Sequence, residues 1–155
     1  MAGQDHKALE VLSPFLKQRP DNTLLHQVAF PALEAITELH RGNAEKALEL
    51  LKAAAPYDGA DTGVHYLRAT AYLQSSRPAE AVTEYQKVLS LKLGRPFGPD
   101  PTIVLAQLGL ARAYAAQGDK AKARTAYQDL LAIWKDADSD LPLVQKAKAE
   151  YAKLQ

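Results

Sequence analysis

Histidine is the residue type in this chain that most readily binds metals or moves protons, and the sequence has four of them. None lies in an HExxH pattern, in which two histidines on one helix face hold a zinc ion and a glutamate acts as the base. We therefore expect surface or helix-capping histidines and no metal site. The four are His6, His26, His40 and His65.

Other motifs of catalysis and phosphate binding are also missing from the sequence. There is no P-loop, no dinucleotide-binding GxGxxG and no GxSxG nucleophile motif. Gly94 and Gly98 lie among prolines in a loop, and no strand precedes them to build a phosphate site. The absence of cysteine excludes disulfides, cysteine-bound zinc and thiol catalysis, but it leaves the compartment open. We predict neither an enzyme nor a cofactor-binding protein.

The charge and the hydropathy of the chain exclude two further classes of protein. The formal net charge is +1, whereas nucleic acids are bound by a concentrated basic face. The modest basic cluster of Lys146, Lys148 and Lys153 fits the solvated side of a helix. No apolar run approaches the roughly 20 residues that cross a bilayer. We expect no nucleic acid and no membrane insertion, while the localisation stays unknown.

Helices are the elements that must position any functional residue. Alanine and leucine make up about a third of the 155 residues, and strand-forming residues are sparse. This composition favours an all-α fold in one domain. Apolar spacing and turn residues predict eight helices. Their expected ranges are 5–17, 22–41, 44–54, 62–75, 78–91, 101–117, 120–135 and 140–154.

Pro31 interrupts the second of these helices. A proline inside a helix removes a hydrogen bond and clashes with the preceding turn, which costs about 3 kcal/mol unless the helix kinks. The alternative is a separate turn over 23–30, with Pro31 opening the helix that follows.

The last predicted helix is amphipathic. We expect Asp140 to cap its N-terminus. The face opposite its apolar stripe is polar, which suits the end of a stacked array. The stripe consists of Leu143, Ala147, Tyr151 and Leu154.

A pattern of three residues recurs along the chain. Gly42, Ala47 and Leu51 are followed 34 residues later by a small residue, an alanine and a bulky apolar residue, and again after a further 42. The eight extra residues fall within 91–101, where glycines and prolines forbid a regular helix. The later copies are Ser76, Ala81, Tyr85 and Gly118, Ala123, Tyr127.

The pattern has a physical reason if each repeat is a pair of antiparallel helices. Alanine at the crossing lets two backbones approach, and the bulky residue four positions later covers the next repeat. Glycine in the turn accepts the left-handed conformation that ends a helix, and asparagine or aspartate then caps the next one. The alanines expected at the crossings are Ala35, Ala47, Ala69, Ala81, Ala111 and Ala123.

This pattern resembles the tetratricopeptide repeat, which has a period of 34 residues. The resemblance implies an all-α, TPR-like right-handed superhelical solenoid of antiparallel helix pairs that ends in a C-terminal capping helix. It divides a single domain over 1–155 into a truncated repeat, three full repeats and the cap. These are 1–20, then 22–56, 62–92 and 101–135, then 140–154.

The first segment fits only the second helix of a repeat, with Gly3 in the turn and Ala8 at the crossing. We expect the first helix of that repeat to be missing, so that an apolar face is exposed. A second copy of the chain can cover that face, which predicts a possible homodimer. The residues expected to self-associate are Leu9, Leu12 and Leu16.

The last third of the chain is similar to the C-terminal repeats attached to bacterial serine/threonine protein kinases. The similarity rests on GLARAYAAQGDKAKARTAYQDLLAIWKDADSDLPLVQKAKAEYAKLQ and on AAAPYDG at 53–59. It implies a regulatory or recruitment module of a larger bacterial signalling protein. Glu34 and Arg68 depart from the pattern, because that first-helix position is usually apolar, and we expect them to form an ion pair between repeats.

Tetratricopeptide repeats turn their first helices toward a concave groove that holds another polypeptide. The resemblance therefore implies a protein-binding scaffold, whose groove takes a helix or an extended segment of an unidentified protein or peptide partner. The charged clamp for a chaperone's C-terminal carboxylate is replaced by Ala32, Ile36, Leu67 and Gly109. The predicted groove residues are Ile36, Leu39, His40, Tyr66, Thr70, Leu73, Leu105, Leu108 and Arg112.

Two alternatives stay open from the sequence. Leu39, Leu73 and Leu108 can each pack inside the array instead of meeting a partner. Structural self-association through the first segment can also be the main role.

Overall fold

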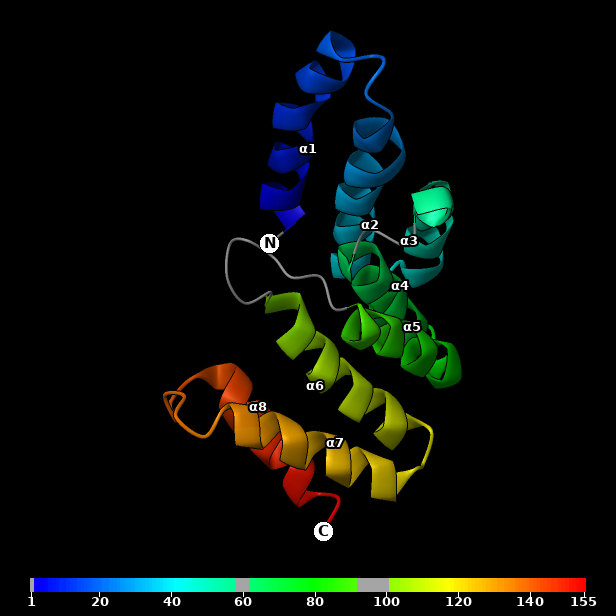
Figure 1. Ribbon diagram of the computed structural model, residues 1–155. Coiled ribbons are helices and arrows are strands. Elements are labelled where there is room, and N and C mark those ends of the chain that lie inside the picture. The colour runs from blue at the N-terminus through cyan, green and yellow to red at the C-terminus, as the bar shows by residue number, and fades with distance from the viewer. Residues whose placement is uncertain (1, 58–61, 92–100) are drawn as a thin grey trace.

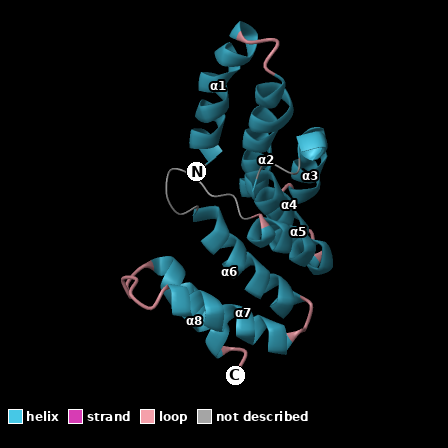
Figure 2. Cartoon of the chain, in the orientation of Figure 1, coloured by secondary structure: helices cyan, strands magenta, loops and turns pink. Residues whose placement is uncertain are grey.

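The computed structural model describes residues 2–57, 62–91 and 101–155, and within them all side chains except those of residues 2–6, 8, 9 and 12. In these parts of the chain every regular element is a helix (Figure 2). A π-helix, η1 (Leu25–Ala29), precedes α2, and a 3₁₀-helix, η2 (Lys52–Tyr57), follows α3. The α-helices are α1 Ala2–Gln18, α2 Phe30–His40, α3 Ala44–Leu51, α4 Thr62–Gln74, α5 Pro78–Ser90, α6 Pro101–Ala116, α7 Lys120–Ile133 and α8 Pro142–Ala152.

The helices pack as successive pairs, α2 with α3, α4 with α5 and α6 with α7 (Figure 1). Each pair contacts the next, through α3 and α4 and then through α5 and α6. At the two ends, α1 packs on α2 and α8 packs on α7. The predicted all-α solenoid of stacked helix pairs is therefore confirmed.

The alanines predicted at the helix crossings are all fully buried. Because alanine has no side chain beyond Cβ, paired backbones approach closely at these points. Leu51, Tyr85 and Tyr127, the bulky residues of the pattern, are buried as well. Three apolar clusters run through the array along this line of residues.

Residues with positive φ end the first helix of each full pair. They are Gly42 (φ 83°), Ser76 (φ 58°) and Gly118 (φ 80°). In each turn the following residue bonds back to the end of the helix, as where Asn43 N–H donates to Glu38 O at 2.8 Å. The predicted left-handed turns are confirmed.

The predicted helix caps are only partly correct. Asp119 caps α7, because its carboxylate accepts from Lys122 N–H at 3.0 Å. Asn43 does not cap α3, since its side-chain amide donates to Glu38 at 2.7 Å instead. No side chain caps α8, so the role predicted for Asp140 is wrong.

Pro31 is accommodated by the π-turn before α2. It occupies the first turn of α2, where a missing N–H costs no helical hydrogen bond. In the π-turn, Phe30 N–H donates to Leu25 O, five residues earlier. This bond makes the helix wider just before the proline. Asn22 starts this segment by accepting Leu25 N–H at 3.0 Å. The chain is helical without a break from residue 23 to His40, so neither a regular helix through Pro31 nor a separate turn before it is formed: one helix carries a π-helical segment just before the proline.

Both ends of the array differ in detail from the sequence prediction. α1 begins at Ala2, so Gly3 lies inside the helix rather than in a turn. Of the stripe predicted on α8, Ala147 is buried and Tyr151 and Leu154 pack against the third core cluster, whereas Leu143 is exposed and Val144 is buried in its place. Adjacent residues lie about 100° apart around a helix, so this one-residue shift turns Leu143 away from the core.

Two predicted connections between repeats also need correction. The ion pair expected between Glu34 and Arg68 is not formed, although both residues are described. Arg68 Nη2 instead donates to Leu51 O at 3.0 Å and so ties α4 to α3. The lengthened connection predicted at 91–101 lies outside the described residues, apart from its two end residues.

Candidate functional site

Three adjoining hollows follow the first helices of the pairs. The first lies between η1, α2 and α4 and has a volume of about 610 Å³. The second lies between α2 and α4 (about 390 Å³) and the third between α4 and α6 (about 340 Å³). Neighbouring hollows share lining residues, so they form one surface, which we call the inner channel. The shared residues are Ile36, Gly63 and Leu67, then Tyr66, Thr70 and Gln74.

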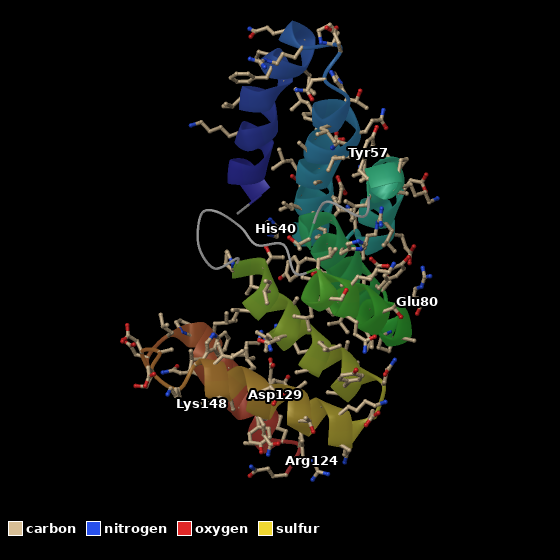
Figure 3. All side chains as sticks on the ribbon, in the orientation of Figure 1. His40, Tyr57, Glu80, Arg124, Asp129 and Lys148 are labelled. Carbon is tan, nitrogen blue, oxygen red and sulfur yellow. The ribbon has the colours of Figure 1, made fainter. Side chains whose placement is uncertain are left out.

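The inner channel brings together all the residues that the sequence assigned to the groove. His40 lies at the end of α2 near the start of α6, while Glu80 projects from α5 on the other side of the view in Figure 3. The second hollow contains Ile36, Leu39, His40, Tyr66 and Thr70, and the third contains Tyr66, Thr70, Leu73, Leu105, Leu108 and Arg112.

The apolar residues of the channel lie at different depths. Leu39 and Leu108 are 7% and 2% exposed and belong to the core, so they form its floor. Leu73 is half-buried against the second core cluster. Ile36 and Leu105 are half-buried but are not part of the three core clusters. Among the apolar residues predicted for the groove, these two are the ones that lie outside the core clusters.

Tyr85 and Gly109 form the floor of the third hollow together. A Cβ atom at position 109 would lie 2.2 Å from Tyr85 Cζ, so only glycine leaves room for the ring. Burial raises the pKa of Tyr85 to about 12, although the hydrogen bond with Thr70 opposes the rise. The two hydroxyl oxygens lie 3.3 Å apart. The phenol is thus an uncharged part of the floor at neutral pH.

Arg112, the charged residue of the predicted groove, is paired with α8. Its Nε and Nη2 donate to the two carboxylate oxygens of Glu150 at 2.8 and 3.0 Å. Tyr127 Oη donates to the same carboxylate at 2.8 Å. Burial alone would lower the pKa of Arg112, but the hydrogen bond and the charge of Glu150 outweigh it and the pKa is raised. The guanidinium is therefore neutralised within the chain.

Two exposed leucines extend the channel beyond the predicted residues. Leu24 lines the first hollow and Leu143 lines the third. Leu143 belongs to α8, so the capping helix also forms a wall of the channel. The repeat pattern could not identify either residue, because Leu24 precedes the π-turn and Leu143 lies outside the aligned segments.

A further hollow of about 500 Å³ lies on the outer face between α3, α4 and α5. Its lining is charged, but the charges bond to one another. Lys87 pairs with Glu84 at 2.6 Å, and Lys52 pairs with Glu49. Arg77 lies 4.6 Å above the Tyr72 ring and also pairs with a glutamate, Glu80. These contacts stabilise the pair of helices and leave this hollow without an obvious ligand.

Two of the histidines, His65 and His26, make contacts within the chain. His65 Nδ1 donates to Glu84 Oε2 at 2.7 Å, and both residues are buried, so the surface position predicted for His65 is wrong. His26 Nε2 lies 3.0 Å from Arg19 O, near the end of α1, and fits the predicted capping role. The side chain of His6 lies outside the described residues. No group of three or more potential metal ligands occurs in the described part of the chain.

The residues predicted to self-associate are only partly described. Leu16 is half-buried, while the side chains of Leu9 and Leu12 lie outside the described residues. On the same helix, Val11 and Phe15 are 60% and 51% exposed. The apolar surface of α1 that is visible in the structure is therefore centred on these two residues.

The described ranges were also searched for helices that could cross a membrane. None of the helices there has both the length and the apolar character to span a bilayer.

Comparison with known proteins supports the TPR-like fold of the middle of the chain. Residues 61–136, which contain α4 to α7, match the family model of the tetratricopeptide repeat. The structure is accordingly a TPR-like all-α solenoid. Tetratricopeptide repeats mediate protein–protein interactions through the extended surfaces that such solenoids form.

One curated relative carries both repeats and a second kind of domain. The chain is 37% identical over 94 residues to the tetratricopeptide repeat and J domain-containing co-chaperone DNJ1 of Fusarium oxysporum f. sp. lycopersici. The alignment covers 61% of this chain and 16% of the relative, so the chain spans a small part of that protein's length. No solved structure matches the chain significantly.

Proposed function

We propose that this chain is a non-catalytic protein-interaction scaffold that holds an apolar segment of a partner protein in the inner channel. One observation carries the proposal: a continuous apolar surface crosses three successive first helices. Ile36 and Leu105 on this surface are half-buried and belong to none of the three core clusters, and Leu24 and Leu143 are exposed. The accessible part of these side chains is not used for packing inside the array. Burying it against a partner would be favourable by about 25 cal/mol per Å².

Selection from a random peptide library tests this function. Peptides would be captured on the wild-type chain, and their affinities would then be compared with those for a Leu105→Glu variant, which places a charge in the third hollow. We expect peptides that bind wild type at least tenfold more tightly than the variant. Thr83→Glu, on the exposed side of α5, is the matched control and should bind like wild type. Peptides that bind all three proteins equally would contradict a role for the channel.

A narrower proposal concerns the parent protein. The last third of the chain is similar to repeats attached to bacterial serine/threonine kinases, which supports a regulatory or recruitment module in a larger signalling protein. The J-domain co-chaperone relative supports a partner related to protein folding instead. The two proposals are distinguished by co-expressing the wild type or Leu105→Glu with a kinase or with a chaperone system and measuring the activity of each. Only the system to which the chain belongs should change its activity with the variant.

Self-association is the second candidate function, and the exposure of Val11 and Phe15 favours it. Light scattering over a concentration series tests it. This candidate predicts a mass that rises above 16.9 kDa with concentration and returns to 16.9 kDa in a Phe15→Glu variant. A constant mass near 16.9 kDa in the wild type would contradict it.

A further inference from the structure

The exposed side of α1 carries an apolar stripe with polar ends. Val11 and Phe15 lie four positions apart in the helix and are 60% and 51% exposed. Positions four apart lie one above the other on a helix, so the two side chains form one stripe. Lys7 and Gln18 are exposed beyond its two ends. An apolar centre within a polar rim is the arrangement of a surface that packs on another helix.

Two opposite charges lie along one edge of this stripe. Glu10 and Lys17 are both exposed, and Glu10 directly precedes Val11 in the sequence. Residues seven positions apart lie on the same side of a helix, so both charges flank the stripe on the same edge. The edge is therefore negative toward the N-terminus of α1 and positive toward its C-terminus.

This distribution of charge is complementary to a reversed copy of itself. When two α1 helices lie antiparallel and cross between Val11 and Phe15, each of these residues packs beside the other one in the second copy. The same arrangement brings each Glu10 beside Lys17 of the second copy, because residues on the edges of such a stripe meet across the helix pair. A parallel arrangement would place Glu10 at the level of Glu10 and form neither pair. The antiparallel contact is two-fold symmetric, so each favourable pair occurs twice.

The other end of the array does not offer a matching surface. α8 lies at that end, opposite α1 in Figure 1. Lys146 and Lys148 are exposed on α8, and its large exposed apolar residue, Leu143, lines the third hollow of the channel. A head-to-tail stack of copies would therefore place lysines against the apolar stripe of α1, which is unfavourable. Contact of α1 with a second α1 places apolar groups against apolar groups instead.

We propose that two copies of the chain form a dimer through α1, with the two helices antiparallel and each Glu10 paired with Lys17 of the second copy. This inference rests on the self-association described above as the second candidate function, and it specifies which surfaces meet and in which direction. Two large apolar side chains per copy bury little area compared with the about 1,600 Å² of a standard interface, so the dimer is weak and reversible. The described residues that line the inner channel lie outside α1 and take no part in the contact.

Charge reversal on each side of the proposed ion pair tests the direction of the helices. Analytical ultracentrifugation at low salt would give the dimer dissociation constants of the wild type, Glu10→Lys and Lys17→Glu. Each variant brings like charges together twice, so we expect its dissociation constant to rise about tenfold or more. An equimolar mixture of the two variants should form a heterodimer about as tight as the wild-type dimer. One of its contacts is the native pair, and the other is the same pair with its charges exchanged.

Matched charge changes away from α1 are the controls. Lys148→Glu on α8 and Asp129→Lys on α7 change the net charge as the two test variants do, and both residues are exposed. These controls should dimerise like the wild type. High salt should bring the dissociation constants of the wild type and the two test variants closer together, because it screens exposed charges. Circular dichroism should report the wild-type helix content in every variant.

The possible failures are separable. A wild-type mass that stays at 16.9 kDa at every concentration would overturn self-association itself. A dimer that is lost in Phe15→Glu but is unchanged in Glu10→Lys and Lys17→Glu would overturn the antiparallel arrangement and leave self-association through α1 intact. Two monomeric charge variants that stay monomeric when mixed would also contradict the proposed ion pair. A dimer that survives Phe15→Glu but is lost in Leu105→Glu would move the contact from α1 to the inner channel.

Discussion

Gly109 is a residue at which local helix propensity and packing make opposite predictions. Alanine in the middle of α6 is expected to stabilise the helix by about 1 kcal/mol. Packing predicts the reverse, because the new Cβ would lie 2.2 Å from the buried Tyr85 ring. We expect Gly109→Ala to lower the free energy of unfolding by about 1–3 kcal/mol, since overpacking forces the ring to move.

Urea unfolding of a double-mutant set checks this prediction. In a Tyr85→Leu background the ring is gone, so Gly109→Ala should cost much less than in the wild type. An increase in stability for Gly109→Ala alone would mean that the close approach of α5 and α6 is not as described.

Ser76 carries a conformation that costs stability. Its φ of 58° is left-handed, as are those of the glycines at the equivalent turns. We expect Ser76→Gly to raise the free energy of unfolding by about 0.5–1 kcal/mol, because relief of the left-handed strain exceeds the extra chain entropy of glycine. Gly118→Ala is the reverse control and should lose about 1 kcal/mol in thermal unfolding, although its Cβ would meet nothing within 4 Å. If both variants changed the free energy of unfolding in the same direction, the positive φ at these two turns would be contradicted.

At the scale of the elements, α8 depends on a few polar contacts. Glu150 accepts from Arg112 of α6 and from Tyr127 of α7, so one carboxylate joins three helices. We expect Glu150→Gln to lower the free energy of unfolding by about 1–3 kcal/mol, because charge-assisted hydrogen bonds are lost. Asp129→Asn, on the exposed face of α7, is the control and should change little.

The same contact predicts a pH dependence. Burial would raise the pKa of Glu150, but the hydrogen bonds from Arg112 and Tyr127 outweigh it and hold the pKa below its ordinary 4.5. The contribution of Glu150 is therefore complete above about pH 4.5 and is lost as the pH falls through the lower folded pKa. The stability difference between wild type and Glu150→Gln should shrink below pH 4.5. A difference that is constant between pH 7 and pH 3 would contradict the ion pair.

At this scale the sequence predicted the elements well and their ends less well. Alanines and turn glycines located the pairs because close backbone approach and positive φ each restrict the residue type strongly. The buried face of α8 was misjudged by one residue, since Leu143 and Val144 are both apolar and only packing decides between them. The cap at Asn43 failed because Glu38, five residues earlier in α2, accepts a hydrogen bond from the Asn43 side-chain NH₂ group and so holds that side chain against α2.

At the scale of the whole molecule, the groove was predictable in outline only. Repeat positions identified Ile36 and Leu105, because equivalent residues face the same side of a regular array. The pairing of Arg112 with Glu150 joins residues 38 apart and follows no repeat rule. The first hollow depends on a π-turn, which no sequence pattern specified. The sequence also could not predict how deeply each apolar side chain of the channel is buried, because packing decides this.

Stability is expected to vary along the array. The middle pairs are packed on both sides, whereas α1 packs mainly on α2 and exposes Val11 and Phe15. Repeat arrays open from their ends, where fewer contacts must break. We expect amide hydrogen exchange, followed by mass spectrometry, to be fastest in α1 and slowest in α4 to α6. Equal protection in α1 and α5 would contradict this ordering.

The central claim is that a partner occupies the inner channel, and amide chemical-shift mapping tests it most directly. ¹⁵N-labelled chain would be titrated with a peptide selected on the wild-type protein. The account predicts that the largest shifts occur at channel residues such as Ile36, Tyr66 and Leu105. Largest shifts on the outer face, around Glu49 and Arg77, would mean that partners bind the opposite side of the array and would contradict the account.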